Sequence, residues 1–224
     1  MKTNGRWLIN LCFHGVGSPN RALEPGEERY WITEEFFLRI LDLIADRPDV
    51  GLSFDDGNQS DREIGLPALV ERGLLAGFFP IACRLDRPGS LSEDDLRTLV
   101  SSGMSVGTHG MYHQSWRTVR DGGLVAELET ARSVLSSVIG AEIREAACPL
   151  GDYDRRVLGE LRRRGYAHVL TSDRHLARSD SWLQPRFSVR AGDDVDSIRL
   201  ILSHHPSVLE QLRNQGKMLA KRWR

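Results

Sequence analysis

Short apolar runs alternate with amphipathic stretches along most of this 224-residue chain. The apolar runs are bounded by glycine, proline or charged residues, a pattern that predicts buried strands. The segments predicted in this way are 7–13, 50–54, 74–82, 104–108, 143–148, 166–170 and the extended segment 182–189.

The stretches between them carry apolar residues three and four positions apart, which is the spacing of one helix face. Thr33 can cap a helix that carries Phe36, Phe37, Ile40, Leu41 and Ile44 on one side. A capping-box pattern at 60–63 opens the next helix, in which Pro67 marks a late start or a kink. The other predicted helices are 93–102, 123–139, 153–164 and most of 194–218, and residues 18–31 form a long loop.

This alternation predicts an α/β fold with parallel strands and helical crossovers. The chain contains no glycine-rich phosphate loop and no internal repeat, so a closed or nearly closed barrel is favoured over an open nucleotide-binding sheet. We expect one catalytic domain over residues 1–224, which ends in a helical, basic tail at about 194–224.

Charge and cysteine content exclude some classes of protein. Lys and Arg number 30 against 31 Asp and Glu, and this balance argues against general nucleic-acid binding. Cys12, Cys83 and Cys148 are an odd number of thiols in or beside apolar runs, which favours buried reduced cysteines over a disulfide framework. No run is long enough to span a bilayer or resembles a signal peptide, so a cytoplasmic location is expected. The basic tail could still touch an anionic membrane surface.

Polar clusters follow directly after the predicted strands. The clusters are His14-Gly15, Asp55-Asp56-Gly57, Thr108-His109, Cys148 to Gly151 and Thr171 to Asp173. The carboxyl ends of parallel strands in a barrel open on one face, where active sites lie. These clusters are therefore expected to converge.

The Asp55-Asp56 pair and the His109/His113 pair together indicate a metal site. Two imidazoles and one carboxylate are a common catalytic zinc set that leaves a position open for water. The second carboxylate of the pair could then face a substrate. The structural alternatives are an exposed Asp-Asp-Gly turn and a histidine that only caps a loop.

These residues resemble the motifs of the polysaccharide deacetylases with a NodB-type domain, which form carbohydrate esterase family 4. Ser53 to Gly57 matches the first motif, T/S-F-D-D-G, and His109 to His113 matches the second, H-(S/T)-x-x-H, with Gly110 in place of Ser or Thr. Ala147 to Gly151 is a divergent form of the third motif, A-Y-P-Y-G. Phe13-His14 resembles the early Y/F-H motif of the branch that deacetylates poly-N-acetylglucosamine.

The resemblance implies a distorted (β/α) barrel of about seven parallel strands that removes acetyl groups from N-acetylated sugars. It implies that Asp56, His109 and His113 bind one divalent metal ion, with zinc favoured and cobalt, nickel or iron as alternatives. Asp55 would be the general base, and the backbone N–H of Leu150 would help to stabilise the oxyanion.

Two family features are missing from their usual places. The third motif lacks its arginine, and Arg186 is a candidate substitute from another strand. The late L-x-H motif, which supplies the acid, has only one late candidate, Ser203-His204-His205-Pro206. His14 is favoured as the acid because it follows a strand, and His204 and His205 are the late alternatives, in a stretch that is predicted to be helical.

Other residues near the third motif are candidates for substrate binding. They are Cys148, Pro149, Gly151, Tyr153 and Asp173, for which packing or turn roles are the alternatives. The leading hypothesis is a metal-dependent N-deacetylase of a sugar or glycan precursor. A catalytically weak glycan-binding protein, or a hydrolase of another amide or an acetyl ester, remains the alternative.

Overall fold

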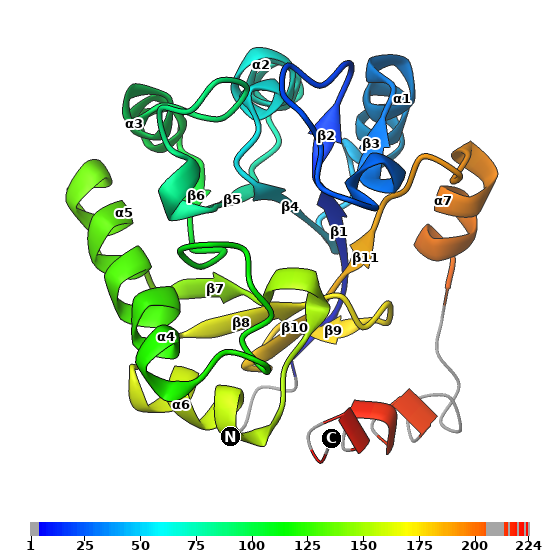
Figure 1. Cartoon of the computed structure of the whole chain (residues 1–224). Coiled ribbons are helices and arrows are strands. Elements are labelled where there is room, and N and C mark those ends of the chain that lie inside the picture. Colours follow the sequence, from blue (N-terminus) through cyan, green and yellow to red (C-terminus); the bar gives the residue numbers. More distant parts are fainter. Residues whose placement is uncertain (1–4, 205–212, 215, 219, 222, 224) are drawn as a thin grey trace.

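The computed structural model describes residues 5–204, 213–214, 216–218, 220–221 and 223. Its strands are surrounded by helices (Figure 1), so the chain has an α/β fold. The main sheet has the order β11-β1-β4-β5-β6, in which all neighbours are parallel. Its strands are β1 (Trp7–Phe13), β4 (Val50–Asp56), β5 (Gly77–Pro80), β6 (Ser105–Val106) and β11 (Phe187–Ser188), and β9 (Ala177–Arg178) pairs antiparallel with β1.

A second parallel sheet contains β10 (Leu183–Pro185), β8 (His168–Thr171) and β7 (Glu145–Ala147). Two connections join it to the main sheet. Thr108, just after β6, forms a parallel bridge with Ala146 of β7, and only Arg186 separates β10 from β11. A third, short pair consists of β2 (Gly15–Val16) and β3 (Trp31–Ile32).

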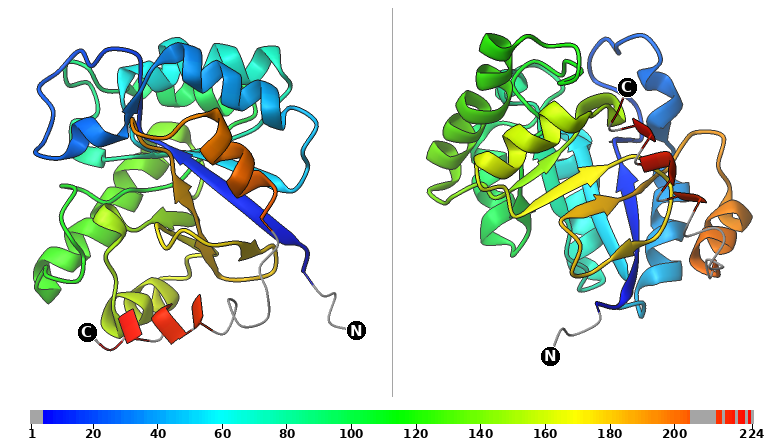
Figure 2. Two further views of the ribbon diagram at one scale, coloured as in Figure 1. Left: turned by 90° about the vertical axis from the view of Figure 1, so that its right-hand side faces the viewer. Right: turned by 90° about the horizontal axis from the view of Figure 1, so that it is seen from below.

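The helices lie outside the strands in all the views (Figures 1 and 2). They are α1 (Glu34–Ile44), α2 (Leu66–Glu71), α3 (Glu93–Ser101), α4 (Asp121–Val125), α5 (Ala131–Ile139), α6 (Arg155–Arg163) and α7 (Val195–Leu202). A π-helical turn, Ala126–Thr130, joins α4 to α5, which confirms the long helix predicted for this region. Within the described residues, no helix is long and apolar enough to cross a membrane.

Local sequence signals explain most helix ends. The Thr33 hydroxyl accepts a hydrogen bond from the Phe36 N–H, and Ser92 forms a reciprocal capping box with Asp95. The capping box predicted at Ser60 is wrong. Ser60 has helical φ and ψ values and does not cap the helix through its side chain. Its hydroxyl instead accepts a hydrogen bond from the Val16 N–H.

The C-terminal helix prediction holds only in part. Helix α7 ends at Leu202, and His204 follows the last turn with no helical assignment, so the helix predicted through His204 is wrong there. His205 lies outside the described residues. Residues 213–214, 216–218 and 220–221 are helical.

Two apolar clusters form the core. The larger contains four phenylalanines, Phe13, Phe37, Phe54 and Phe78, whose rings contact one another from β1, α1, β4 and β5. The smaller packs α6 against the second sheet around Trp116 and Tyr153. Both clusters anchor the strands immediately before the polar strand ends, so those ends are held in place by packing.

Candidate active site

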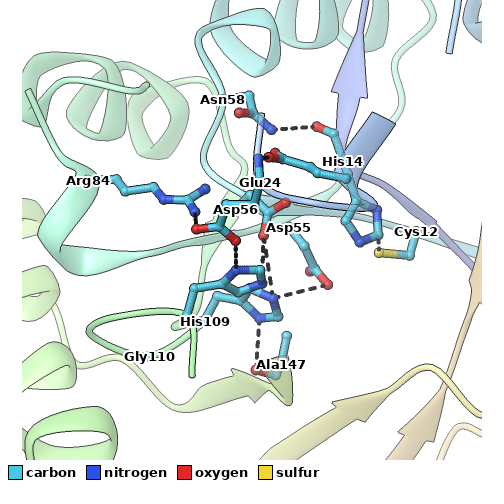
Figure 3. A network of polar contacts seen from close by, with 12 residues as sticks. Cys12, His14, Glu24, Asp55, Asp56, Asn58, Arg84, His109, Gly110 and Ala147 are labelled. Atoms are coloured by element: carbon cyan, nitrogen blue, oxygen red, sulfur yellow. Dashed lines mark hydrogen bonds and ion pairs between the residues drawn. The ribbon is translucent and has the colours of Figure 1, made fainter. Parts of the chain in front are cut away.

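The polar residues that follow the strands meet at one pocket of about 270 Å³. His14 comes directly after β1, Asp55 and Asp56 end β4, and Cys148 comes directly after β7. His109 and His113 line the same pocket from the segment that follows β6. The convergence expected from the sequence is therefore present, and Figure 3 shows several of these side chains from close by.

The turn after β4 brings both aspartates to the same place. Asp56 and Gly57 both have φ near 74°, a left-handed conformation that is uncommon for an aspartate. This breaks the alternation of the strand, and both carboxylates lie within 4 Å of His109 Nε2. A Cβ atom at Gly57 would come within 2.8 Å of Pro80 Cβ. Only glycine therefore fits this turn.

Asp56, His109 and His113 form a compact group of possible metal ligands. Asp56 Oδ1 lies 3.6 Å from His109 Nε2 and 3.5 Å from His113 Nε2. Asp56 Oδ1 is buried and has no hydrogen-bond partner, which is costly for a carboxylate oxygen. A bound cation would remove that cost, so this donor set fits one divalent metal.

Hydrogen bonds orient both imidazoles. His109 Nδ1 lies 2.9 Å from the Ala147 carbonyl oxygen, and only a protonated Nδ1 can donate to it. Burial lowers the pKa of His109 to about 4. The ring is therefore neutral at pH 7, with the lone pair on Nε2 directed toward Asp56.

The second imidazole is held by an acid that the sequence did not reveal. His113 Nδ1 lies 2.8 Å from Glu24 Oε2, and Arg84 in turn binds the Glu24 carboxylate. Carboxylates often orient the histidine ligands of metals in this way. Glu24 belongs to the predicted loop 18–31, where no motif distinguishes it from its neighbours.

Asp55 faces the same pocket but has a different partner. Arg186 donates from Nη1 to Asp55 Oδ1 (2.7 Å) and from Nη2 to Oδ2 (2.6 Å), and Nη1 also donates to the Ser53 hydroxyl. Both side chains are almost fully buried. Burial alone would raise the pKa of Asp55, but the charge and the hydrogen bonds of Arg186 hold it well below its usual value. The structure thus brings Arg186, the predicted substitute for the missing arginine, into direct contact with Asp55.

This buried pair allows a stability test. Arg186→Met should lower the free energy of unfolding by about 3–5 kcal/mol, because it leaves the Asp55 carboxylate buried without a counter-charge. The double variant Asp55→Asn/Arg186→Met should lose less than the sum of the two single variants, since it leaves no uncompensated charge. Urea denaturation of all four proteins measures the coupling, and strictly additive losses would contradict it.

His14 lines the pocket from the end of β1. Its ring stacks on Tyr30 with centroids 4.6 Å apart, and Asn58 donates to its backbone carbonyl. Cys12 Sγ lies 4.0 Å from His14 Nδ1. Cys12, His14 and Asp55 are also close enough to form a metal-ligand group. However, burial raises the pKa of the Cys12 thiol and Asp55 already binds Arg186, so this group is the poorer cation site.

The third motif forms a tight turn at the pocket rim. Leu150 has φ 56° within the 3₁₀ turn Pro149–Gly151 and is exposed. Cys148, Leu150 and Gly151 line the pocket, whereas the buried Pro149 is not among the lining residues.

Two other predicted substrate contacts do not line this pocket. Tyr153 is fully buried, and its hydroxyl donates to Asp173 Oδ2 at 2.7 Å. Asp173 also accepts hydrogen bonds from Thr171 and Lys221. Lys221 donates to the Gly151 carbonyl as well, and this links the C-terminal segment to the third-motif turn. Tyr153 and Asp173 therefore do not face the pocket, and they contact the third-motif turn through Lys221.

Comparisons with known proteins agree with the motifs. The polysaccharide deacetylase family model matches residues 44–169, more than half of the chain. The chain is 20% identical over 194 residues to YxkH of Bacillus subtilis (strain 168), and the match covers 80% of this chain and 70% of YxkH.

Two further relatives differ in how much of their own length is matched. The chain is 28% identical over 162 residues to chitin deacetylase 1 of Cryptococcus neoformans var. grubii, covering 67% of this chain but only 33% of that protein. The solved structure of the Streptococcus pyogenes deacetylase PplD in complex with acetate is similar in fold. Its TM-score is 0.77 at 15% identity, over 89% of this chain and 100% of that one.

Proposed function

Because the chain belongs to the polysaccharide deacetylase family, we propose that it is a metal-dependent hydrolase that removes acetyl groups from an N-acetylated sugar or glycan precursor. The observation that carries this proposal is the unpartnered Asp56 Oδ1, which faces the Nε2 atoms of His109 and His113. The arrangement matches a two-histidine, one-carboxylate metal site with room for further ligands.

Asp56, His109 and His113 would hold the metal, which we propose to be zinc, with cobalt, nickel and iron as alternatives. A bound divalent cation would polarise the acetyl carbonyl and lower the pKa of an attacking water. The neutral His109 and the anionic Asp56 are in the protonation states that metal binding requires.

Asp55 is positioned to take the proton of the attacking water. Its carboxylate stays ionised because Arg186 binds both of its oxygens, and the same two bonds orient it toward the pocket. The exposed Leu150 turn at the rim could offer its backbone N–H to the oxyanion that forms on the acetyl carbonyl. We assign these roles because Asp55 and Leu150 line the same pocket as the proposed metal ligands.

The departing amine needs a proton, and we assign its delivery to His14. This residue lines the pocket, whereas His204 is not among the lining residues and follows α7. His14→Ala should keep the metal but lose amide hydrolysis by at least about a hundredfold, the lower range for positioned acid catalysis. Activated acetyl esters should suffer less, because their leaving group needs no proton.

The measurement for His14 compares amide and ester rates at equal metal content. His204→Ala is the matched control and should behave like the wild type. Equal losses on amide and ester, or a loss confined to the His204 variant, would remove His14 from the acid role.

Acetate release tests the overall function. The protein is stripped with a chelator, reloaded with each of the four metals, and incubated with chitooligosaccharides or with acetyl esters. Release of acetate from the amide substrates only after metal is restored would support the proposal. Stoichiometric metal with no acetate release would favour a glycan-binding protein. The missing third-motif arginine suggested that alternative, and the contact of Arg186 with Asp55 weakens it.

We also propose that the two sheets form one distorted barrel of about seven parallel strands. The Thr108–Ala146 bridge and the direct continuation of β10 into β11 support this arrangement. A cytoplasmic location and a membrane contact through the basic tail stay predictions.

A further inference from the structure

Three arginines lie at the pocket or next to residues that line it, and none of them has a carboxylate partner among the described residues. Arg29 lines the pocket directly. The Arg190 guanidinium lies 5.9 Å from the ring centre of Tyr30, and Arg174 donates to the Ser188 carbonyl at 2.7 Å. Tyr30 and Ser188 are both lining residues. The positive charge is thus gathered at one end of the pocket.

Apart from Asp56, which belongs to the proposed metal site, the acids of the same pocket already bind cationic partners. Glu24 binds Arg84 and His113, Glu27 binds Arg21, and Asp55 binds Arg186. Among the described residues, no carboxylate forms an ion pair with Arg29, Arg174 or Arg190. Asp193 does accept a bond close by, but from the backbone N–H of Arg190.

One hydrogen bond orients the exposed side chain of Arg29. Its Nε donates to the Gly26 carbonyl at 2.9 Å, which leaves both terminal nitrogens of the guanidinium without a partner among the described residues. The Ala191 N–H donates to the Arg29 carbonyl at 2.8 Å and so ties the segments that carry Arg29 and Arg190 together. A guanidinium held in this way can bind two oxygens of one anion at a reduced entropic cost.

The position of these arginines relative to His14 indicates which part of a substrate they would meet. The acetyl group belongs at Asp56, and the amine nitrogen belongs near His14. Tyr30, whose ring stacks on that of His14, and the neighbouring Arg29 both line the pocket on this side, so we place the rest of the sugar along them. A substituent at this end would meet Arg29 first.

We propose that the substrate is an N-acetylated sugar that carries a phosphoryl group, bound by Arg29 and Arg190 with Arg174 nearby. This inference rests on the proposed deacetylase function and specifies its substrate class. A phosphate carries close to two negative charges at pH 7 and matches three guanidinium groups that have no carboxylate partner better than a single carboxylate does. The phosphoryl group can belong to a sugar monophosphate or to a diphosphate-linked sugar.

Binding to the metal-free protein tests this inference separately from catalysis. Calorimetry at low salt compares N-acetylglucosamine 1-phosphate, its uridine diphosphate derivative, the neutral methyl glycoside and N-acetylmuramic acid. At least one phosphorylated sugar should bind about tenfold tighter or more than the methyl glycoside, the effect expected of one charge-assisted hydrogen bond. If the 1-phosphate binds more tightly, the site is one for a sugar monophosphate. If the uridine diphosphate derivative binds more tightly, it is one for a diphosphate-linked sugar.

Charge-neutralising variants then assign the preference to these residues. The double variant Arg29→Gln/Arg190→Gln should lose most of the preference for the phosphorylated sugar. Arg39→Gln removes an exposed arginine of α1 that pairs with Glu35, and it should keep the preference. On the metal-loaded enzyme, the ratio of kcat/KM for phosphorylated and neutral substrates should fall in the double variant by a similar factor.

Other results would contradict either phosphoryl recognition or the deacetylase function, and the two failures can be told apart. Equal binding of phosphorylated and neutral sugars, a preference that survives the double variant, or equally tight binding of N-acetylmuramic acid would refute phosphoryl recognition by these arginines. If the phosphorylated sugar is preferred but no acetate is released from any substrate after metal is restored, the phosphoryl site stands and the deacetylase function fails.

Discussion

Asp55→Asn is expected to bind metal with wild-type stoichiometry and to lose at least about a hundredfold in turnover, the lower range for positioned acid–base catalysis. Asparagine keeps the shape of the side chain but cannot accept the proton of the attacking water. The bidentate contact with Arg186 explains why Asp55 is ionised and yet is a poor metal ligand, since both of its oxygens are already engaged.

The neighbouring residue provides the matched control. Asp56→Asn changes the same functional group one position further along the same turn, but it should lose the metal as well as the activity. Metal content by atomic emission, circular dichroism and acetate release on both variants separate the two roles. A metal-loaded Asp55→Asn enzyme with near-wild-type turnover would show that Asp55 is not the base.

Removal of a proposed metal ligand is expected to have the largest effect. His113→Ala should lose bound metal and acetate release together, because it leaves one imidazole and one carboxylate to hold the ion. Glu24→Gln removes only the carboxylate that orients His113, so metal affinity should fall by about 10–100-fold instead of disappearing. The effects are graded because His113 would bind the ion directly, whereas Glu24 acts only through His113.

His168→Ala is the control for these substitutions. This histidine pairs with Glu145 at the start of β8 and is absent from the residues that line the pocket, so its loss should leave metal content unchanged. Stoichiometric metal in the triple variant Asp56→Ala/His109→Ala/His113→Ala would show that the ion binds elsewhere.

The sequence could predict the order of strands and helices because periodicity reports which face of each element is buried. The apolar runs at 7–13 and 50–54 correspond to β1 and β4, although β4 continues through both aspartates. The run 74–82 overestimated β5, because Ala76, Ile81 and Ala82 are buried although they lie outside the strand. The local signal at Ser60 failed for a related reason, since a tertiary contact with Val16 competes for its hydroxyl.

By itself, the sequence determined that Asp55, Asp56, His109 and His14 lie close to strand ends, because parallel strands open on one face. Only the tertiary structure decided which side chains bind and orient the residues of the site. Arg186 reaches Asp55 because it directly precedes β11, which only β1 separates from β4 in the main sheet. Glu24 reaches His113 because the loop before α1 lines the same pocket. Tyr153 is turned into the core by the packing of α6. Such contacts join segments far apart in the chain, and no local pattern records which of them will meet.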